Sequence, residues 1–176
     1  MHPIIIGIAG AHSGVGKTTV ACEILKRFEG WGAIKYSKTS FFSSITDDRE
    51  VILTKGKDTR RMMDAGAVRV LWVQSPPDEL PDILPLGLEM LSGLQGIVIE
   101  GNSAVNVIKP DIVVFVSGDP VLFKDSAGPL LDMADIVLSD TESSQQLSEA
   151  GRFRIDDIGG YLHRIKRIIE EKSINR

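Results

Sequence analysis

The stretch Ala9-Gly10-Ala11-His12-Ser13-Gly14-Val15-Gly16-Lys17-Thr18-Thr19 follows directly on the apolar run of residues 3–8 and decides the fold. An apolar strand, a glycine-rich loop and a helix in this order are typical of a phosphate-binding loop. Gly14 and Gly16 let peptide N–H groups approach triphosphate oxygens closely, because no Cβ stands in the way. Lys17 supplies a mobile cation, and the Thr18 hydroxyl is placed to ligate Mg²⁺. The sequence therefore predicts that the chain binds ATP or GTP together with Mg²⁺.

The loop departs from the strict pattern at one position, Ala11, where glycine is usual and another small residue is tolerated. His12 could touch a phosphate or a water, but a solvated loop side chain is the favoured interpretation. The residues that we expect to bind the nucleotide are Ser13, Gly14, Val15, Gly16, Lys17, Thr18 and Thr19.

Length and composition indicate one well-buried domain, since the chain has 176 residues of which 43% are hydrophobic. A net charge of −4 without a Lys/Arg cluster argues against a nucleic-acid surface. The single cysteine excludes an internal disulfide, which fits a reducing cytoplasm. The apolar run at 3–8 is too short for a secretory segment, and no apolar run is long enough to span a bilayer, so we expect a cytoplasmic protein without a membrane partner.

Short runs rich in Ile and Val predict strands at 3–8, 31–36, 68–74, 96–100, 111–117 and 135–138. Their hydrophobicity is nearly continuous, which indicates a parallel sheet covered on both faces. Helical patterns lie near 18–29, 58–65, 78–93, 121–133, 142–150 and 156–172. The expected fold is a single-domain α/β P-loop NTPase fold, with a mostly parallel central sheet and helices on both faces.

The long polar segment 36–59 favours a substrate-facing or switch loop, because a stretch of this length in a compact domain is usually functional or disordered. Within it, residues 51–53 predict a small extra strand.

Ligands of open parallel sheets bind beyond the carboxyl ends of the strands, so residues that follow each apolar run are site candidates. These candidates are Lys35, Ser37, Asp47, Asp48, Asp58, Glu100, Gly101, Asn102, Ser117, Asp119, Ser139 and Asp140. Glu100 ends a predicted strand where an acid could hold Mg²⁺ through water or orient a nucleophile; the alternative is an acid that merely faces solvent. The expected Mg²⁺ ligands are Thr18, Glu100 and one of Asp47 or Asp48, although adjacent acids in a polar loop are often only turn residues. The expected catalytic residues are Lys17, Glu100 and Asp48.

The phosphate-binding loop, the strand segment Ala33-Ile34-Lys35-Tyr36 and above all Gly56-Lys57-Asp58-Thr59-Arg60-Arg61-Met62-Met63-Asp64-Ala65-Gly66-Ala67 resemble the molybdopterin-guanine dinucleotide biosynthesis protein B family. The resemblance covers roughly residues 4–75. It implies an often dimeric protein that binds GTP or ATP with Mg²⁺, hydrolyses it slowly and assists nucleotide attachment to molybdopterin. By position, Lys35, Asp58 and Glu100 would face the phosphates.

Two sequence features distinguish the chain from other classes of P-loop protein. Many GTP-binding proteins read guanine with Asn-Lys-x-Asp after the last core strand, whereas this chain has Ser139-Asp140-Thr141-Glu142 there, so the choice between ATP and GTP stays open. Dimeric partition ATPases begin the loop with a lysine that reaches the partner's phosphates; His12 stands there, so cross-dimer activation is not expected.

The sequence is compatible with three functions. One is an accessory protein of molybdenum-cofactor biosynthesis with weak NTPase activity, acting with a pterin, as a homodimer or with a partner enzyme. Another is an ATP-dependent kinase or ligase of a small metabolite, since the loop, Lys35 and the Glu100-Gly101 pair also resemble dethiobiotin synthetase. The third is a non-enzymatic, nucleotide-gated adaptor for a metalloenzyme.

Overall fold

A computed structural model describes residues 3–118, 122–124, 127–140 and 151–174. Among these residues, eight strands form one sheet in the order β3-β4-β2-β5-β1-β6-β7-β8, and every neighbouring pair is parallel except β3 and β4. The strands are β1 (Ile4–Gly10), β2 (Gly32–Lys38), β3 (Ser44–Thr46), β4 (Val70–Ser75), β5 (Gly96–Glu100), β6 (Ile112–Val116), β7 (Ile136–Ser139) and β8 (Gly151–Arg154). The helices are α1 (Lys17–Arg27), α2 (Arg49–Ile52), α3 (Asp58–Asp64), α4 (Leu80–Glu89), α5 (Asn102–Ile108), α6 (Gly128–Asp132) and α7 (Ile158–Ile174).

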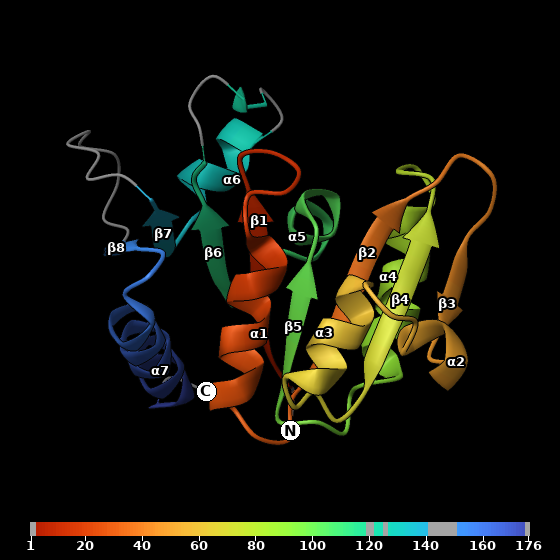
Figure 1. Ribbon diagram of the computed structural model, residues 1–176, viewed down its shortest axis with the longest axis horizontal. Helices are drawn as coiled ribbons and strands as arrows, with labels where there is room; N and C mark the ends of the chain where they lie inside the picture. Colours follow the sequence, from red (N-terminus) through yellow and green to blue (C-terminus); the bar gives the residue numbers. More distant parts are fainter. Residues whose placement is uncertain (1–2, 119–121, 125–126, 141–150, 175–176) are drawn as a thin grey trace.

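Helices cover the sheet on both faces (Figure 1). Side chains alternate across a strand, so in β1 Ile6 and Ile8 pack with α1, α3 and α7, while Ile5 packs with α4 on the opposite face. Both sets of side chains are withdrawn from water, which is why the strands read as continuous apolar runs. The predicted α/β fold with a mostly parallel, doubly covered sheet is confirmed.

The predicted extra strand at 51–53 is wrong. Asp48 accepts hydrogen bonds from the backbone N–H groups of Glu50 (2.8 Å) and Val51 (3.4 Å), and this N-cap starts the short helix α2 instead. The extra strand is instead β3, whose midpoint lies seven residues earlier in the sequence and which pairs antiparallel with β4. A three-residue edge strand carries too little periodicity to be recognised in a sequence.

Two further elements were not predicted, α5 and β8. Helix α5 is seven residues long and contains β-branched side chains, which weakens its helical pattern. Of the predicted helix at 121–133, only Gly128–Asp132 form a described α-helix, α6, and the predicted helix at 142–150 lies outside the described residues. Within the described ranges, no helix combines the length and the apolar character that crossing a bilayer requires.

Candidate functional site

The predicted phosphate-binding loop connects the end of β1 to the start of α1, as its sequence indicates. Gly14 (φ +78°) and Gly16 (φ +105°) adopt left-handed backbone conformations that favour glycine. Lys17 begins α1 and folds back over the loop, where its Nζ donates to the carbonyl oxygen of His12 at 3.0 Å. The amino end of an eleven-residue helix therefore points at the same space as the loop, an arrangement suited to an anion.

Asn102, the first residue of α5, fixes the strand end that precedes the loop. Its Oδ1 accepts from the backbone N–H of Gly10 (3.0 Å), and its Nδ2 donates to the carbonyl oxygen of Gly10 (2.8 Å). Strand β5 pairs with β1 only as far as Ile8 and Glu100, so the Asn102 amide continues the ladder where β5 has ended. One side chain thus satisfies both backbone groups of Gly10.

We expect Asn102→Ala to lower the free energy of unfolding by about 2 kcal/mol, because two backbone groups lose their partner. Urea unfolding of the variant and the parent protein measures this difference. Asn106→Ala is the matched control, since Asn106 lies on the exposed face of the same helix. Equal midpoints for the two variants would contradict the role given to Asn102.

A cavity of about 730 Å³ lies over the loop at the carboxyl ends of β1, β2 and β5. The residues that line it are His12, Ser13, Gly14, Gly16, Lys17, Thr18, Thr19, Lys35, Tyr36, Lys38, Asp58, Arg61, Glu100, Gly101, Asn102, Ser103 and Lys124. Five of these described residues are lysines or arginines and two are acids. The surplus of cations suits a polyphosphate.

A chain of side-chain contacts begins at Thr18 on α1. The Thr18 hydroxyl donates to Glu100 Oε2 at 2.8 Å, and Lys35 Nζ donates to Glu100 Oε1 at 2.6 Å. The Glu100 side chain is only 2% exposed, so a strand-end acid facing solvent is excluded. A buried carboxylate requires such partners, because burying an unpaired charge costs far more than a hydrogen bond returns.

The same chain of contacts returns to α1 through α3. Lys35 Nζ also lies 2.8 Å from Asp58 Oδ2, and Arg61 Nη1 lies 3.6 Å from Asp58 Oδ1. Arg61 Nη2 then donates to Thr19 Oγ1 at 2.9 Å. Elements α1, β5, β2 and α3 are thereby joined in a closed polar ring, which consists of Thr18, Glu100, Lys35, Asp58, Arg61 and Thr19. The sheet order places β5 between β1 and β2 (Figure 1). The ring therefore connects neighbouring elements at this part of the sheet.

The ionisable groups of the site differ in how well their charges are compensated. Burial opposes the charge on Lys35, but the Glu100 and Asp58 carboxylates outweigh it and raise the pKa of Lys35. Burial also disfavours the Asp58 anion, yet the hydrogen bond from Lys35 lowers the pKa of Asp58. For Lys17 burial prevails over the attraction of Glu100, and its pKa is lowered. The charge of Lys17 is therefore incompletely compensated within the site, and a bound phosphate would stabilise it.

The structure does not bring Asp47 and Asp48 to the cavity, contrary to the prediction of a metal or catalytic role. Strand β3 runs antiparallel to β4 and carries the chain away from the carboxyl edge of the sheet. Asp47 consequently pairs with Arg69 at 2.6 Å, just before β4 begins, and Asp48 caps α2. Both acids have structural partners at the opposite edge, so the Mg²⁺ ligand set and the catalytic set are corrected to exclude them.

The other predicted residues divide into two groups. The cavity lining includes all the predicted loop residues except Val15, together with Lys35, Asp58 and Glu100. It does not include Ser37, Ser117, Ser139 or Asp140, and Asp119 lies outside the described residues.

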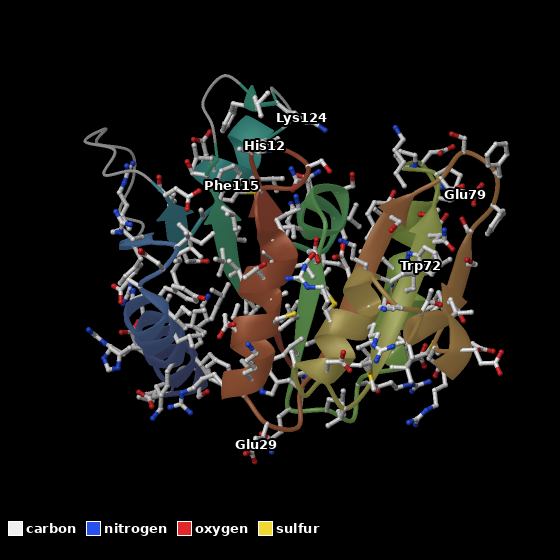
Figure 2. All side chains as sticks on the ribbon, in the orientation of Figure 1. His12, Glu29, Trp72, Glu79, Phe115 and Lys124 are labelled. Carbon is white, nitrogen blue, oxygen red and sulfur yellow. The ribbon has the colours of Figure 1, made fainter. Side chains whose placement is uncertain are left out.

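Three cations that line the cavity were not predicted as site residues from the sequence, namely Lys38, Arg61 and Lys124. Arg61 could have been found, since it stands three residues after Asp58 on one helix face. Lys124 follows β6 by eight residues, and its backbone N–H donates to the carbonyl oxygen of Ala11. Figure 2 shows Lys124 and His12 together at the carboxyl end of the sheet.

His12 is half-buried and differs from the expected solvated side chain. Its Nδ1 lies 2.8 Å from the carbonyl oxygen of Ser13, and its Nε2 is buried without a hydrogen-bond partner among the residues that the structure describes. A Cβ on Gly118 would lie 2.2 Å from His12 Nε2, so glycine at that position leaves room for the ring.

The residues present fit Mg²⁺ bound together with phosphate. Thr18 and Glu100 supply a hydroxyl and a carboxylate at the edge of the loop, and Mg²⁺ prefers oxygen ligands from one or two carboxylates, phosphates and waters. In the part of the chain that the structure describes, no group of three His, Cys, Asp or Glu side chains could hold a metal ion.

Comparisons with known proteins find similarity in structure but not in sequence. No protein-family model matches the chain, and no curated protein sequence matches it. Among solved structures, HypB from Helicobacter pylori in complex with nickel matches with a TM-score of 0.59 and 16% identity, covering 99% of this chain and 88% of that one.

Two further solved structures match over most of this chain. LpxK from Aquifex aeolicus in complex with ATP matches with a TM-score of 0.54 and 15% identity, covering 88% of this chain but 54% of that one, so this chain spans about half of its length. A MobB protein homolog from Bacillus stearothermophilus matches with a TM-score of 0.50 and 15% identity, covering 95% and 98% of the two chains. With the loop of residues 9–19, these matches show that the chain has the fold of the P-loop NTPases.

Proposed function

We propose that the protein binds a nucleoside triphosphate with Mg²⁺ in the cavity over residues 9–19 and hydrolyses it slowly. One observation carries the proposal: the closed polar ring joins the loop helix α1 to Glu100 and Lys35 and borders the cation-rich cavity. A ring of this kind holds its donors in place before a ligand arrives, which lowers the entropic cost of binding.

Each part of the site has a distinct task in this proposal. Backbone N–H groups of the loop and the Lys17 ammonium bind phosphate oxygens, and Arg61 and Lys124 add positive charge along the lining. Thr18 and Glu100 would hold Mg²⁺, which when bound offsets the charge of the phosphates. Glu100 is also the group placed to orient a water, since its carboxylate is fixed by Lys35.

The cellular role that we propose is an accessory function in molybdenum-cofactor biosynthesis. It is supported by the resemblance of the segment 56–67 and by the nearly complete overlap with the MobB homolog. Incubation of the protein with molybdopterin and a radiolabelled nucleotide, in the presence of the enzyme that joins them, tests this role. The protein should increase the yield of the dinucleotide form, and an unchanged yield would contradict the role.

A kinase or ligase of a small metabolite is the second candidate, because a separate cavity of about 270 Å³ adjoins the phosphate site and shares Lys35 and Asp58 with it. LpxK, which has been solved with ATP, shows the same fold. A metabolite that accelerates ATP hydrolysis at least about tenfold would favour this candidate over the accessory role. An adaptor without catalysis would instead bind ATP with no turnover.

We expect the protein to discriminate between ATP and GTP by less than about tenfold, which is about 1.4 kcal/mol. The reason is that Ser139–Glu142 lacks the Asn-Lys-x-Asp side chains that read guanine. Competition of unlabelled ATP and GTP for one fluorescent analogue measures the ratio. A strong preference for GTP would show that another acid, such as Asp140, reads the base.

A further inference from the structure

We infer that Arg61 is a catalytic residue for the proposed hydrolysis, whose guanidinium contacts the terminal phosphate in the transition state. The inference deepens the proposed function and rests on a triphosphate bound in the cavity over residues 9–19. Arg61 lies on α3 and carries the only guanidinium among the described residues that line this cavity. A planar guanidinium binds two phosphate oxygens at once, with a geometry more fixed than that of a lysine ammonium.

The backbone that carries Arg61 is held firmly against the loop helix. Helix α3 packs on α1 (Figure 1). Met62, the next residue, is fully buried in the core that also contains side chains of α1. Thr59 is buried as well, and its hydroxyl donates to the carbonyl oxygen of Ile52 at 2.9 Å. The root of the Arg61 side chain therefore has a fixed position beside the phosphate-binding loop, as a precise contact with a reacting group requires.

The guanidinium itself is only loosely engaged. Arg61 Nη2 donates to Thr19 Oγ1 at 2.9 Å, and this is its only hydrogen bond to the residues that the structure describes. Arg61 Nη1 lies 3.6 Å from Asp58 Oδ1, which is too long for a hydrogen bond, and Asp58 already pairs with Lys35 at 2.8 Å. The Arg61 side chain is 47% exposed. Most of its N–H groups therefore remain available to a phosphate, and the head group has room to turn toward one.

Arg61 lies on the side of the loop where the reacting water is expected. The polar ring joins Arg61 through Asp58 and Lys35 to Glu100, the acid placed to orient a water. Lys124 follows β6, which lies on the other side of β1 from β5, so it approaches the loop from the opposite side. Lys35 is engaged by two carboxylates, at 2.6 and 2.8 Å. Arg61, unlike Lys35, keeps donors for a ligand on the Glu100 side.

The reaction places new negative charge where this guanidinium would act. Hydrolysis forms a bond between the water oxygen and the γ-phosphorus and breaks the bond from that phosphorus to the bridging oxygen. The electron pair of the broken bond stays with the nucleoside diphosphate, and a proton of the water passes to the released phosphate and to solvent. Charge builds on the bridging oxygen and on the γ-phosphoryl oxygens in the transition state, where a preorganised cation lowers the barrier.

Arg61→Ala should lower the single-turnover rate of ATP hydrolysis at least about a hundredfold and leave ATP affinity within about threefold. Arginines that stabilise this transition state contribute about 10³–10⁵ in rate in GTPases, and a contact made mainly in the transition state changes binding little. Arg61→Lys keeps the charge without the planar geometry and should recover the rate only in part. Arg60→Ala is the matched control, because Arg60 pairs with Asp64 at 3.4 Å on the same helix and is not part of the lining.

Two further measurements separate a catalytic Arg61 from one that only supports the ring. Guanidinium ion, at concentrations far below those that unfold proteins, should restore part of the rate of Arg61→Ala and none of the rate of Lys17→Ala. Aluminium fluoride with ADP and Mg²⁺ imitates the phosphoryl group in transfer. The parent should bind ADP more tightly when aluminium fluoride is present, and Arg61→Ala should lose this gain while binding ADP alone as the parent does.

The outcomes distinguish this inference from the proposed function. Hydrolysis at the parental rate in Arg61→Ala, with Lys17-dependent ATP binding intact, would overturn the role of Arg61 alone. An equal loss of affinity and rate would also overturn it, since Arg61 would then be a ground-state contact. A parent protein that binds ATP but gains nothing from aluminium fluoride counts against Arg61 in the same way. A parent that binds no ATP would refute the proposed function, and the inference with it. Arg61→Lys gives the same readouts if the alanine variant does not fold.

Discussion

Lys17→Ala should weaken the binding of ATP or GTP by a factor of about ten to about one hundred. A charge-assisted hydrogen bond contributes roughly 1.5–3 kcal/mol, and this range corresponds to that factor. The effect should be large because Lys17 is partly buried and its pKa is lowered, so its charge is incompletely compensated before a phosphate binds. Isothermal titration calorimetry with the parent and variant proteins measures the change.

The specificity of this effect is tested with two controls. Adenosine lacks phosphates, so the variant should bind it as the parent does. Lys26→Ala removes an exposed lysine of the same helix, which pairs with Glu23 at 2.7 Å, and should leave ATP affinity unchanged. Equal ATP affinity in Lys17→Ala and the parent would refute the phosphate-binding role of the loop.

Glu100→Gln should reduce the rate of nucleotide hydrolysis at least about tenfold and leave nucleotide affinity within several-fold. The substitution keeps the size of the side chain and removes the charge that Lys35 and Thr18 now contact. An interaction expressed mainly in the transition state lowers the rate without an equal loss of ground-state binding. Phosphate release under single-turnover conditions, across a Mg²⁺ titration, measures the rate.

The parent rate must first be shown to depend on Lys17, since slow basal hydrolysis can come from a contaminant. Glu29→Gln is the matched control, because Glu29 is exposed beyond the end of α1, at the edge of the molecule opposite the site (Figure 2). Hydrolysis at the parental rate in Glu100→Gln would make Glu100 structural. Asp58 would then be the remaining acid of the cavity lining to examine.

The sequence was sufficient for the fold and for much of the site because its signals are local or follow one rule of topology. The order of strand, glycine-rich loop and helix is contained in residues 3–29. Parallel strands end at one edge, and this rule predicted that Lys35, Asp58 and Glu100 lie close to the loop. The distances of 2.6–2.8 Å that join them are found in the structure.

The same rule failed for Asp47 and Asp48, since it assumes that a segment after a strand stays at the carboxyl edge. The antiparallel β3 moves these acids to the other edge, and a strand of three residues has no recognisable pattern. Lys124 and the contact between Lys57 and Trp72 depend on how distant segments pack. Such contacts have no periodicity or spacing in the sequence and require coordinates.

The measurement that tests the central claim most directly is a crystal structure of the protein with Mg²⁺ and a non-hydrolysable ATP analogue. We expect the triphosphate in the 730 Å³ cavity, with Lys17 on its phosphates and Thr18 and Glu100 beside the metal. A triphosphate bound elsewhere on the protein, with the cavity over residues 9–19 filled only by water, would contradict it.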